Sequence, residues 1–224
     1  MTQILIVIAI VLLVLFFAER RWPEKVTRFE EGVLAILMAA ITLVSFTQVV
    51  MRYGFSSGWG GALELTRILF AWLILFGMSY AIKINAHLGV DIVLKALPRK
   101  AMRALAVFGA LAGVLYAVLL LYADWLQLFG SGTKGGALNY WSKMFGIGIG
   151  LDDVRYPEWA QDTFGLQERV QRWIAYLILP IGLSLFGYRC AEAVLRILRG
   201  ERQFVIAGHE AEELVAENKD VLRD

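Results

Sequence analysis

Five ionisable side chains flank one apolar stretch of the chain, and their types could support chemistry. Glu64 and Arg67 precede the stretch. Lys83, His87 and Asp91 follow it. A carboxylate held within a membrane can carry a proton or a cation, and a histidine four residues before an aspartate can share a metal ion on one face of a helix. The rest of the sequence decides whether these groups form a site or lie at the ends of a helix.

The sequence offers little support for an enzyme or a metal site. The chain has only two histidines and one cysteine, whereas metal hydrolysis needs several ligands at defined spacing. No nucleophile and base are paired inside an apolar segment, and no such segment carries an ionisable residue at its centre, where a carrier would keep one. We therefore predict that the protein is not an enzyme and that it has no catalytic residue, no cofactor and no metal site.

The composition indicates an all-α integral membrane protein. Hydrophobic residues make up 58% of the 224 residues and charged residues 19%, against about half and about a quarter in soluble domains. The net charge of +2 provides no field suited to nucleic acid. A spanning helix needs about 17–25 mostly apolar residues. The windows of this kind are 2–18, 31–51, 64–83, 104–125 and 172–198.

The basic residues set the predicted orientation. The first window is followed by Arg20 and Arg21 and has neither a preceding positive charge nor a small-residue cleavage site, so we interpret it as a retained membrane helix. The positive-inside bias then places the N-terminus outside and the C-terminus, with the basic residues from Arg189 onward, in the cytoplasm. The expected organisation is one membrane domain over residues 1–199 with an outer loop at 126–171, followed by a cytoplasmic tail at 200–224.

Residues 85–98 are predicted to form an amphipathic helix in the cytoplasmic interface. His87, Asp91 and Lys95 recur every fourth residue and share one stripe, while apolar residues fall largely on another. On this interpretation His87 and Asp91 form a surface hydrogen bond and bind no metal. Pro98 ends the segment.

A polar stripe follows the second window. Thr42, Ser45, Gln48 and Arg52 fall within about a third of the helix circumference, given about 100° per residue. Such a stripe should face protein in place of lipid. Neighbouring helices of this chain and another subunit are equally acceptable partners, and the sequence leaves the choice open.

Small residues in the fourth window predict close helix packing. Gly109 and Gly113 are four residues apart, a spacing that lets helix backbones approach closely. The pattern carries no evidence of self-association.

A set of residues between positions 49 and 98 has a spacing that resembles a known family. They are Arg52 and Tyr53 at the end of one helix, Glu64, Trp72, Gly77 and Ala81 along the next, and His87, Val90, Asp91 and Pro98 beyond it. This stretch resembles the small membrane subunit, of the DctQ type, of tripartite ATP-independent periplasmic (TRAP) transporters. The later helices resemble the family only as hydrophobic segments in the same order.

The resemblance implies a fold and a set of partners in the bacterial inner membrane. The fold is a four-helix membrane bundle, to which residues 2–18 add a peripheral helix with a periplasmic N-terminus. A periplasmic binding protein would deliver an organic acid to a large membrane subunit, which carries it inward with sodium, and this chain would scaffold that subunit. Sodium and substrate sites then belong to the large subunit. The chain length and the 152–161 segment are most similar to the C4-dicarboxylate group.

The charges around the third window then mark the ends of a helix and contact partners or lipid headgroups. Glu64 at a helix N-terminus is favoured by about 0.3–1 kcal/mol, and Arg67 one turn later can pair with it or with a lipid phosphate. The residues expected to meet a partner or lipid headgroups are Ser45, Gln48, Arg52, Glu64, Arg67, Trp72, Lys83, His87 and Asp91.

Two other functions remain as alternatives. The chain could be the membrane anchor subunit of another multi-subunit complex, although the haem or quinone ligands expected of such an anchor are missing. It could also be a small autonomous homodimeric carrier, for which Glu64 is the acid nearest to a transport role.

Overall fold

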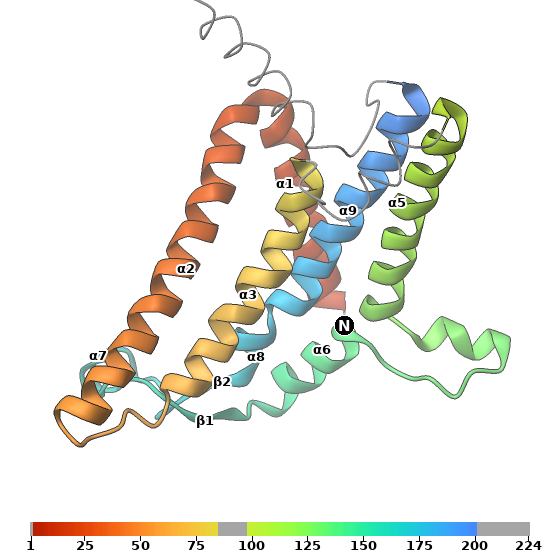
Figure 1. The fold of residues 1–224 in the computed structure, drawn as a ribbon. Coiled ribbons are helices and arrows are strands. Elements are labelled where there is room, and N and C mark those ends of the chain that lie inside the picture. The colour runs from red at the N-terminus through yellow and green to blue at the C-terminus, as the bar shows by residue number, and fades with distance from the viewer. Residues whose placement is uncertain (1, 85–97, 201–224) are drawn as a thin grey trace, which may run out of the picture. The chain divides into compact units, whose positions relative to one another are not determined.

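The computed structural model describes residues 2–84 and 98–200 (Figure 1). Within these ranges five helices are long and apolar enough to cross a membrane, which confirms the predicted helical membrane fold. The predicted interfacial helix at 85–98, with His87 and Asp91, and the tail after Gly200 fall outside the described residues. The elements are α1 (Thr2–Arg21), α2 (Pro23–Gly54), α3 (Ala62–Lys83), α5 (Arg99–Leu121), the 3-10 helix η1 (Asp124–Phe129), α6 (Ala137–Ile147), β1 (Gly150–Arg155), α7 (Glu158–Phe164), β2 (Arg169–Gln171), α8 (Arg172–Tyr176) and α9 (Ile178–Arg199).

The helix ends differ from the predicted windows for local reasons. Pro23 occupies the first turn of α2, where its missing amide hydrogen costs nothing, so α2 starts well before its apolar part. The chain turns into η1 after Leu121, which ends α5 earlier than the window 104–125. The window 172–198 is interrupted between α8 and α9, because Pro180 has no amide hydrogen to donate to the carbonyl of Tyr176.

The chain divides into two units. The first unit comprises Met1–Gly77 and Val118–Leu185, and the second comprises Met78–Ala117 and Phe186–Asp224. Within the first unit, the N-terminal half of α1 packs on α6 through Ile4 and Ile8, which lie against Leu138 and Trp141. The indole of Trp141 also donates a 3.0 Å hydrogen bond to the carbonyl of Trp173. The beginning of α1 therefore lies at the end of the unit that carries α6.

The outer loop of the first unit folds into a layer of short elements. α6, β1, α7, β2 and α8 lie at the end of the unit where α2 ends and α3 begins (Figure 1). β1 and β2 pair antiparallel, with Gly150 opposite Gln171 and Arg155 opposite Arg169, and an irregularity lies between these pairs. This two-stranded sheet was not predicted from the sequence. We call these five elements the outer layer.

The second unit is held by α5 and α9, which run antiparallel. The Arg103 guanidinium donates a 2.6 Å hydrogen bond to the carbonyl of Leu198, and Gly187 lies against Ala117. Between these contacts, a Cβ atom added at Gly113 would lie 2.6 Å from Sγ of Cys190, whereas one added at Gly109 would meet nothing within 4 Å. Of the two glycines of the packing pattern, Gly113 is therefore the one at which this contact requires a small residue.

Candidate functional site

Glu64 connects a membrane helix to the outer layer. Its carboxylate, in the first turn of α3, accepts hydrogen bonds from three consecutive backbone amides of β1. Oε1 accepts from Asp152 at 3.1 Å, and Oε2 accepts from Asp153 at 2.7 Å and from Val154 at 3.1 Å. Hydrogen bonds to an ionised acceptor are about twice as strong as neutral ones. The charge predicted to mark the helix end therefore also holds a strand.

The backbone approach beside Glu64 depends on a glycine. A Cβ atom added at Gly61 would lie 2.8 Å from the backbone oxygen of Asp153, a separation that real Cβ atoms essentially never show. The absence of a side chain at Gly61 lets β1 lie directly against the start of α3. Only then do the three amides come within reach of the carboxylate.

Arg172 is the cation associated with this cluster. It begins α8, donates a 2.9 Å hydrogen bond to Asp152 and acts electrostatically on Glu64. The predicted pair between Glu64 and Arg67 is not present among the described residues, and the Arg67 side chain is exposed. Geometry explains the difference, because the Glu64 carboxylate is turned toward the β1 amides.

Trp72 provides a second connection between α3 and the outer layer. Its indole nitrogen donates a 3.0 Å hydrogen bond to the carbonyl of Ala175 in α8. Trp72 follows Glu64 by eight residues, which corresponds to about 12 Å along a helix. Because the two connections are separated along the axis of α3, this helix fixes both the position and the orientation of the outer layer relative to itself.

The other predicted contact residues are distributed differently. Gln48 accepts a 3.1 Å hydrogen bond from the backbone amide of Trp59 in the loop between α2 and α3. The Arg52 guanidinium lies 6.0 Å from the ring centre of Tyr53, and Ser45 is exposed. Lys83 is half-buried at the end of α3, in the second unit. The structure thus brings Glu64, Trp72 and Gln48 into contacts near the outer layer and leaves Ser45, Arg52 and Arg67 exposed.

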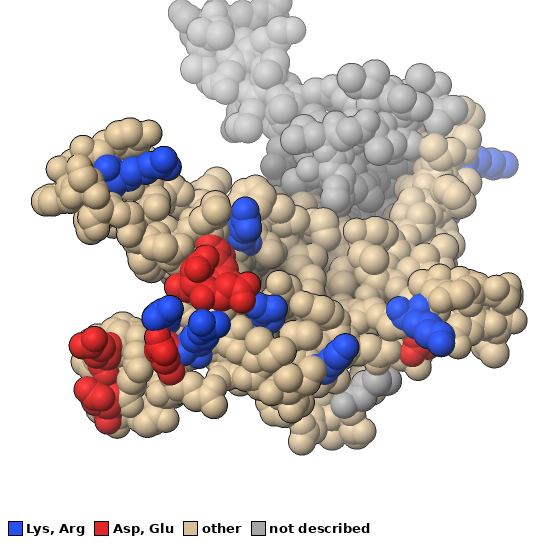
Figure 2. Space-filling model, turned by 90° about the horizontal axis from the view of Figure 1, so that it is seen from below, with Lys and Arg blue, Asp and Glu red and all other residues tan. Residues whose placement is uncertain are grey.

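The outward face of the outer layer carries charges of both signs. Viewed from that end, acidic and basic side chains are interspersed (Figure 2). Arg155 pairs with Glu168 beside the sheet, and Arg172 pairs with Asp152. Such a surface suits a charged protein partner better than a polyanion, because a polyanion requires a basic field.

Two observations on the described residues concern metal binding and the environment of Glu64. Among these residues no group of three or more His, Cys, Asp and Glu residues could hold a metal ion. The Glu64 carboxylate accepts hydrogen bonds from three backbone amides, which occupy most of its acceptor positions. The arrangement is a structural joint between a membrane helix and an exposed layer.

Two buried charged side chains were not predicted from the sequence, Glu30 in α2 and Arg189 in α9. Arg189 was grouped with the cytoplasmic end of the chain, but this side chain lies in the middle of α9 and is only 2% exposed. A spanning segment therefore carries a buried ionisable residue where none was expected from the sequence. Glu192 pairs with it at 3.3 Å and also with Arg196 at 2.6 Å. The three-residue and four-residue spacings of these side chains were the available signal. The contact of Glu64 with the β1 amides could not be predicted in this way, because every residue type except proline carries a backbone amide.

The comparisons with known proteins agree with this picture. The family described as "Tripartite ATP-independent periplasmic transporters, DctQ component" matches residues 41–200. The C4-dicarboxylate TRAP transporter small permease protein DctQ of Vibrio cholerae is 31% identical over 211 residues, covering 89% of this chain and 85% of that protein. The protein of the same name from Pseudomonas aeruginosa is 33% identical over 204 residues, covering 78% and 85%.

A third relative is more distant, and the search of solved structures gave no match. The protein of the same name from Rhodobacter capsulatus is 24% identical over 213 residues, covering 81% of this chain and 82% of that protein. No solved structure matches the chain. The family match spans most of the chain, and two of these relatives are at least 30% identical over most of their length. The chain therefore belongs to the DctQ component family of tripartite ATP-independent periplasmic transporters, and it is a multi-pass membrane subunit, not an enzyme.

Proposed function

We propose that this small permease subunit scaffolds the large membrane subunit of its transporter and presents the outer layer to the periplasmic binding protein. The observation that carries the proposal is the Glu64 carboxylate, which connects α3 to three amides of β1. Hydrogen bonds of this kind fix an exposed surface relative to a membrane helix, and this role requires no catalytic group. Sodium-coupled transport of the substrate is assigned to the large subunit.

The proposed substrate is an organic acid of the C4-dicarboxylate class. Support comes from the names of the relatives in Vibrio cholerae, Pseudomonas aeruginosa and Rhodobacter capsulatus. The outer layer and the helices of the described chain contain no feature that selects one organic acid over another. The substrate proposal therefore rests on similarity alone.

The exposed part of the polar stripe on α2 is proposed as a contact with the large subunit. Gln48 is turned to the loop that follows α2, but Ser45 and Thr42 are exposed, and the Thr42 hydroxyl donates to the Met38 carbonyl of its own helix. Polar side chains on a membrane helix favour a protein neighbour over lipid. Since the described part of this chain does not cover Ser45, the large subunit is the expected neighbour.

Co-expression with the neighbouring gene products tests the scaffold proposal. The chain should co-purify with a large membrane subunit, and organic-acid uptake should require both. Ser45→Trp should lower the yield of the complex several-fold, whereas Leu43→Trp, an equally exposed position on the opposite side of α2, should not. Uptake by this chain alone would refute the proposal and favour an autonomous carrier, and co-purification with an unrelated enzyme would favour a membrane anchor.

The proposed orientation has the outer layer and the N-terminus in the periplasm. Support comes from the first unit, where Ile4 and Ile8 of α1 pack on α6, and from the positive-inside bias of the sequence. Single cysteines at Thr2, His87 and Lys134, introduced after Cys190→Ala, test it in intact spheroplasts. Positions 2 and 134 should react with an impermeant maleimide and position 87 should not. Labelling at position 87, or none at position 2, would contradict the proposed topology.

A further inference from the structure

A closed loop extends from the last turn of α5 and contains η1. We call residues 122–136 the η1 loop. Its two ends meet, because the amide of Ala123 donates a 2.6 Å hydrogen bond to the carbonyl of Gly135. A Cβ atom added at Gly136, where φ is +138°, would lie 2.6 Å from the backbone oxygen of Leu121. The base of the loop is therefore pressed against the last residue of α5.

Asp124 ties the two sides of the base of the loop together. The Asp124 carboxylate accepts hydrogen bonds from the amide of Gly135 and, at 3.0 Å, from the side chain of Asn139. The Gly135 hydrogen bond holds the pKa of Asp124 below its ordinary value. Ser131 and Thr133 share a further hydrogen bond. These bonds hold the loop in shape without a partner.

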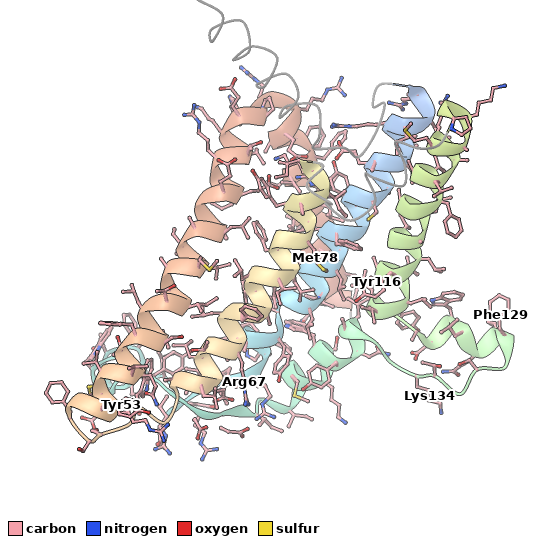
Figure 3. The ribbon with its side chains drawn as sticks, viewed as in Figure 1. Tyr53, Arg67, Met78, Tyr116, Phe129 and Lys134 are labelled. Carbon is pink, nitrogen blue, oxygen red and sulfur yellow. The ribbon has the colours of Figure 1, made fainter. Side chains whose placement is uncertain are left out.

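The tip of the loop is apolar and exposed. Leu128 is 86% exposed and Phe129 is 78% exposed, although both are large hydrophobic side chains. Phe129 contacts only the edge of the Trp125 ring among the described aromatic side chains, with ring centres 6.0 Å apart. Phe129 and Lys134 point to opposite sides of the loop, and Phe129 lies on the side from which the last turn of α5 enters (Figure 3).

We propose that Leu128 and Phe129 insert into the lipid bilayer that α5 spans, so that the η1 loop is an interfacial anchor. The base of the loop adjoins Leu121, the last residue of a spanning helix, so the tip is held at the level of the membrane surface. An apolar face at this level enters the boundary between headgroups and acyl chains by about 5–10 Å. Lys134, on the other side of the loop, remains in water or beside lipid phosphates.

Lipid is favoured over a protein partner because the loop presents a small apolar tip on one side and a lysine on the other. The backbone of the loop is already closed, Phe129 and Lys134 point to opposite sides of it, and the two residues at the tip carry no polar side chain. A protein interface of stable size combines an apolar centre with a polar rim of many residues, whereas the exposed tip offers two side chains.

The test uses the full-length chain in vesicles of phosphatidylethanolamine and phosphatidylglycerol. Phe129→Cys and Lys134→Cys are each labelled with an environment-sensitive fluorophore. The unsubstituted chain is the labelling blank, because its single cysteine, Cys190, is buried. Lipids carrying a spin label in the upper acyl chain should quench the probe at 129 several-fold more than the probe at 134. Aqueous iodide should give the opposite order.

Both positions are exposed, so the substitutions leave the core unchanged, and monodisperse gel filtration confirms the fold of each labelled protein. Equal iodide quenching at 129 and 134, with no lipid quenching, would overturn the proposal. The proposal would also fail if the probe at 129 became shielded only after addition of the large subunit, because the tip would then bind protein. Neither outcome depends on whether the complex transports a C4-dicarboxylate.

Discussion

Replacing Glu64 by alanine is expected to release β1 from α3 while the membrane helices stay folded. Three amides, those of Asp152, Asp153 and Val154, would lose their common acceptor. Hydrogen bonds to a charged group contribute about 1.5–3 kcal/mol each when buried. Because water can replace the carboxylate at this partly exposed position, we expect a total loss of about 1–3 kcal/mol, or roughly 5- to 150-fold in the opening equilibrium of β1. Hydrogen exchange at residues 152–154 measures it directly.

Glu64→Gln separates the charge from the shape of the side chain. Its carbonyl oxygen can still serve Asp153 and Val154, but its amide group would face the donor of Asp152. Exchange should therefore rise most at Asp152 and by less than in Glu64→Ala. Glu158→Gln, an exposed acid of α7, is the matched control and should leave the exchange of β1 unchanged. Unaltered protection of β1 in Glu64→Ala would show that the hydrogen bonds to the carboxylate do not hold the strand.

Gly113→Ala should destabilise the packing of α5 against α9. With the backbone unchanged, the new methyl group would lie 2.6 Å from Sγ of Cys190, so the two helices must separate or the cysteine must move. Overpacking of this kind costs about 1–3 kcal/mol. The midpoint of thermal unfolding in detergent, followed by tryptophan fluorescence, should fall by several degrees. Cysteine reactivity should rise in parallel, because Cys190 is otherwise buried.

Two further variants determine whether the contact with Cys190 is the cause. The first variant combines Gly113→Ala with Cys190→Ala and is compared with Cys190→Ala alone. Because the sulfur is absent in both, Gly113→Ala should lower the stability much less in this background than in the unsubstituted chain. Gly109→Ala adds the same methyl group one turn earlier, where nothing lies within 4 Å, and should be neutral or slightly stabilising. Equal losses in Gly109→Ala and Gly113→Ala would mean that the GxxxG spacing acts as a whole and that the Cys190 contact is incidental.

The sequence was most informative where hydrophobicity alone decides the structure. Spanning helices require long apolar runs, so the five membrane segments could be located from composition. The ends of these segments depend on single residues. Pro23 lets α2 begin before its apolar part, and Pro180 separates α8 from α9. Hydropathy averages over such residues, which explains the shifted boundaries.

The outer layer could not be predicted because its contacts join distant parts of the chain. Glu64 meets residues 152–154 across almost half of the sequence, and the donors are backbone amides with no compositional signature. Local spacing instead favoured Arg67 as the partner of Glu64, although Arg172 is the cation near it. Periodicity grouped Gln48 with Ser45 in a stripe expected to face protein of this chain or of another subunit, and Gln48 accepts a hydrogen bond from the amide of Trp59 in this chain. At Glu64 the tertiary contact overrode the local pattern.

The hydrogen bonds of Glu64 also have a consequence for biogenesis. Val154 follows Glu64 by 90 residues, so the strand is not yet synthesised when α3 leaves the ribosome. Until then the carboxylate lacks these three amides, and the cost of moving a charged side chain into the hydrocarbon favours a position of the start of α3 at the membrane surface. We therefore expect the same glutamate to act at two stages: it first favours a surface position for the start of α3 during insertion, and it then binds β1 once the chain has been translated past residue 154.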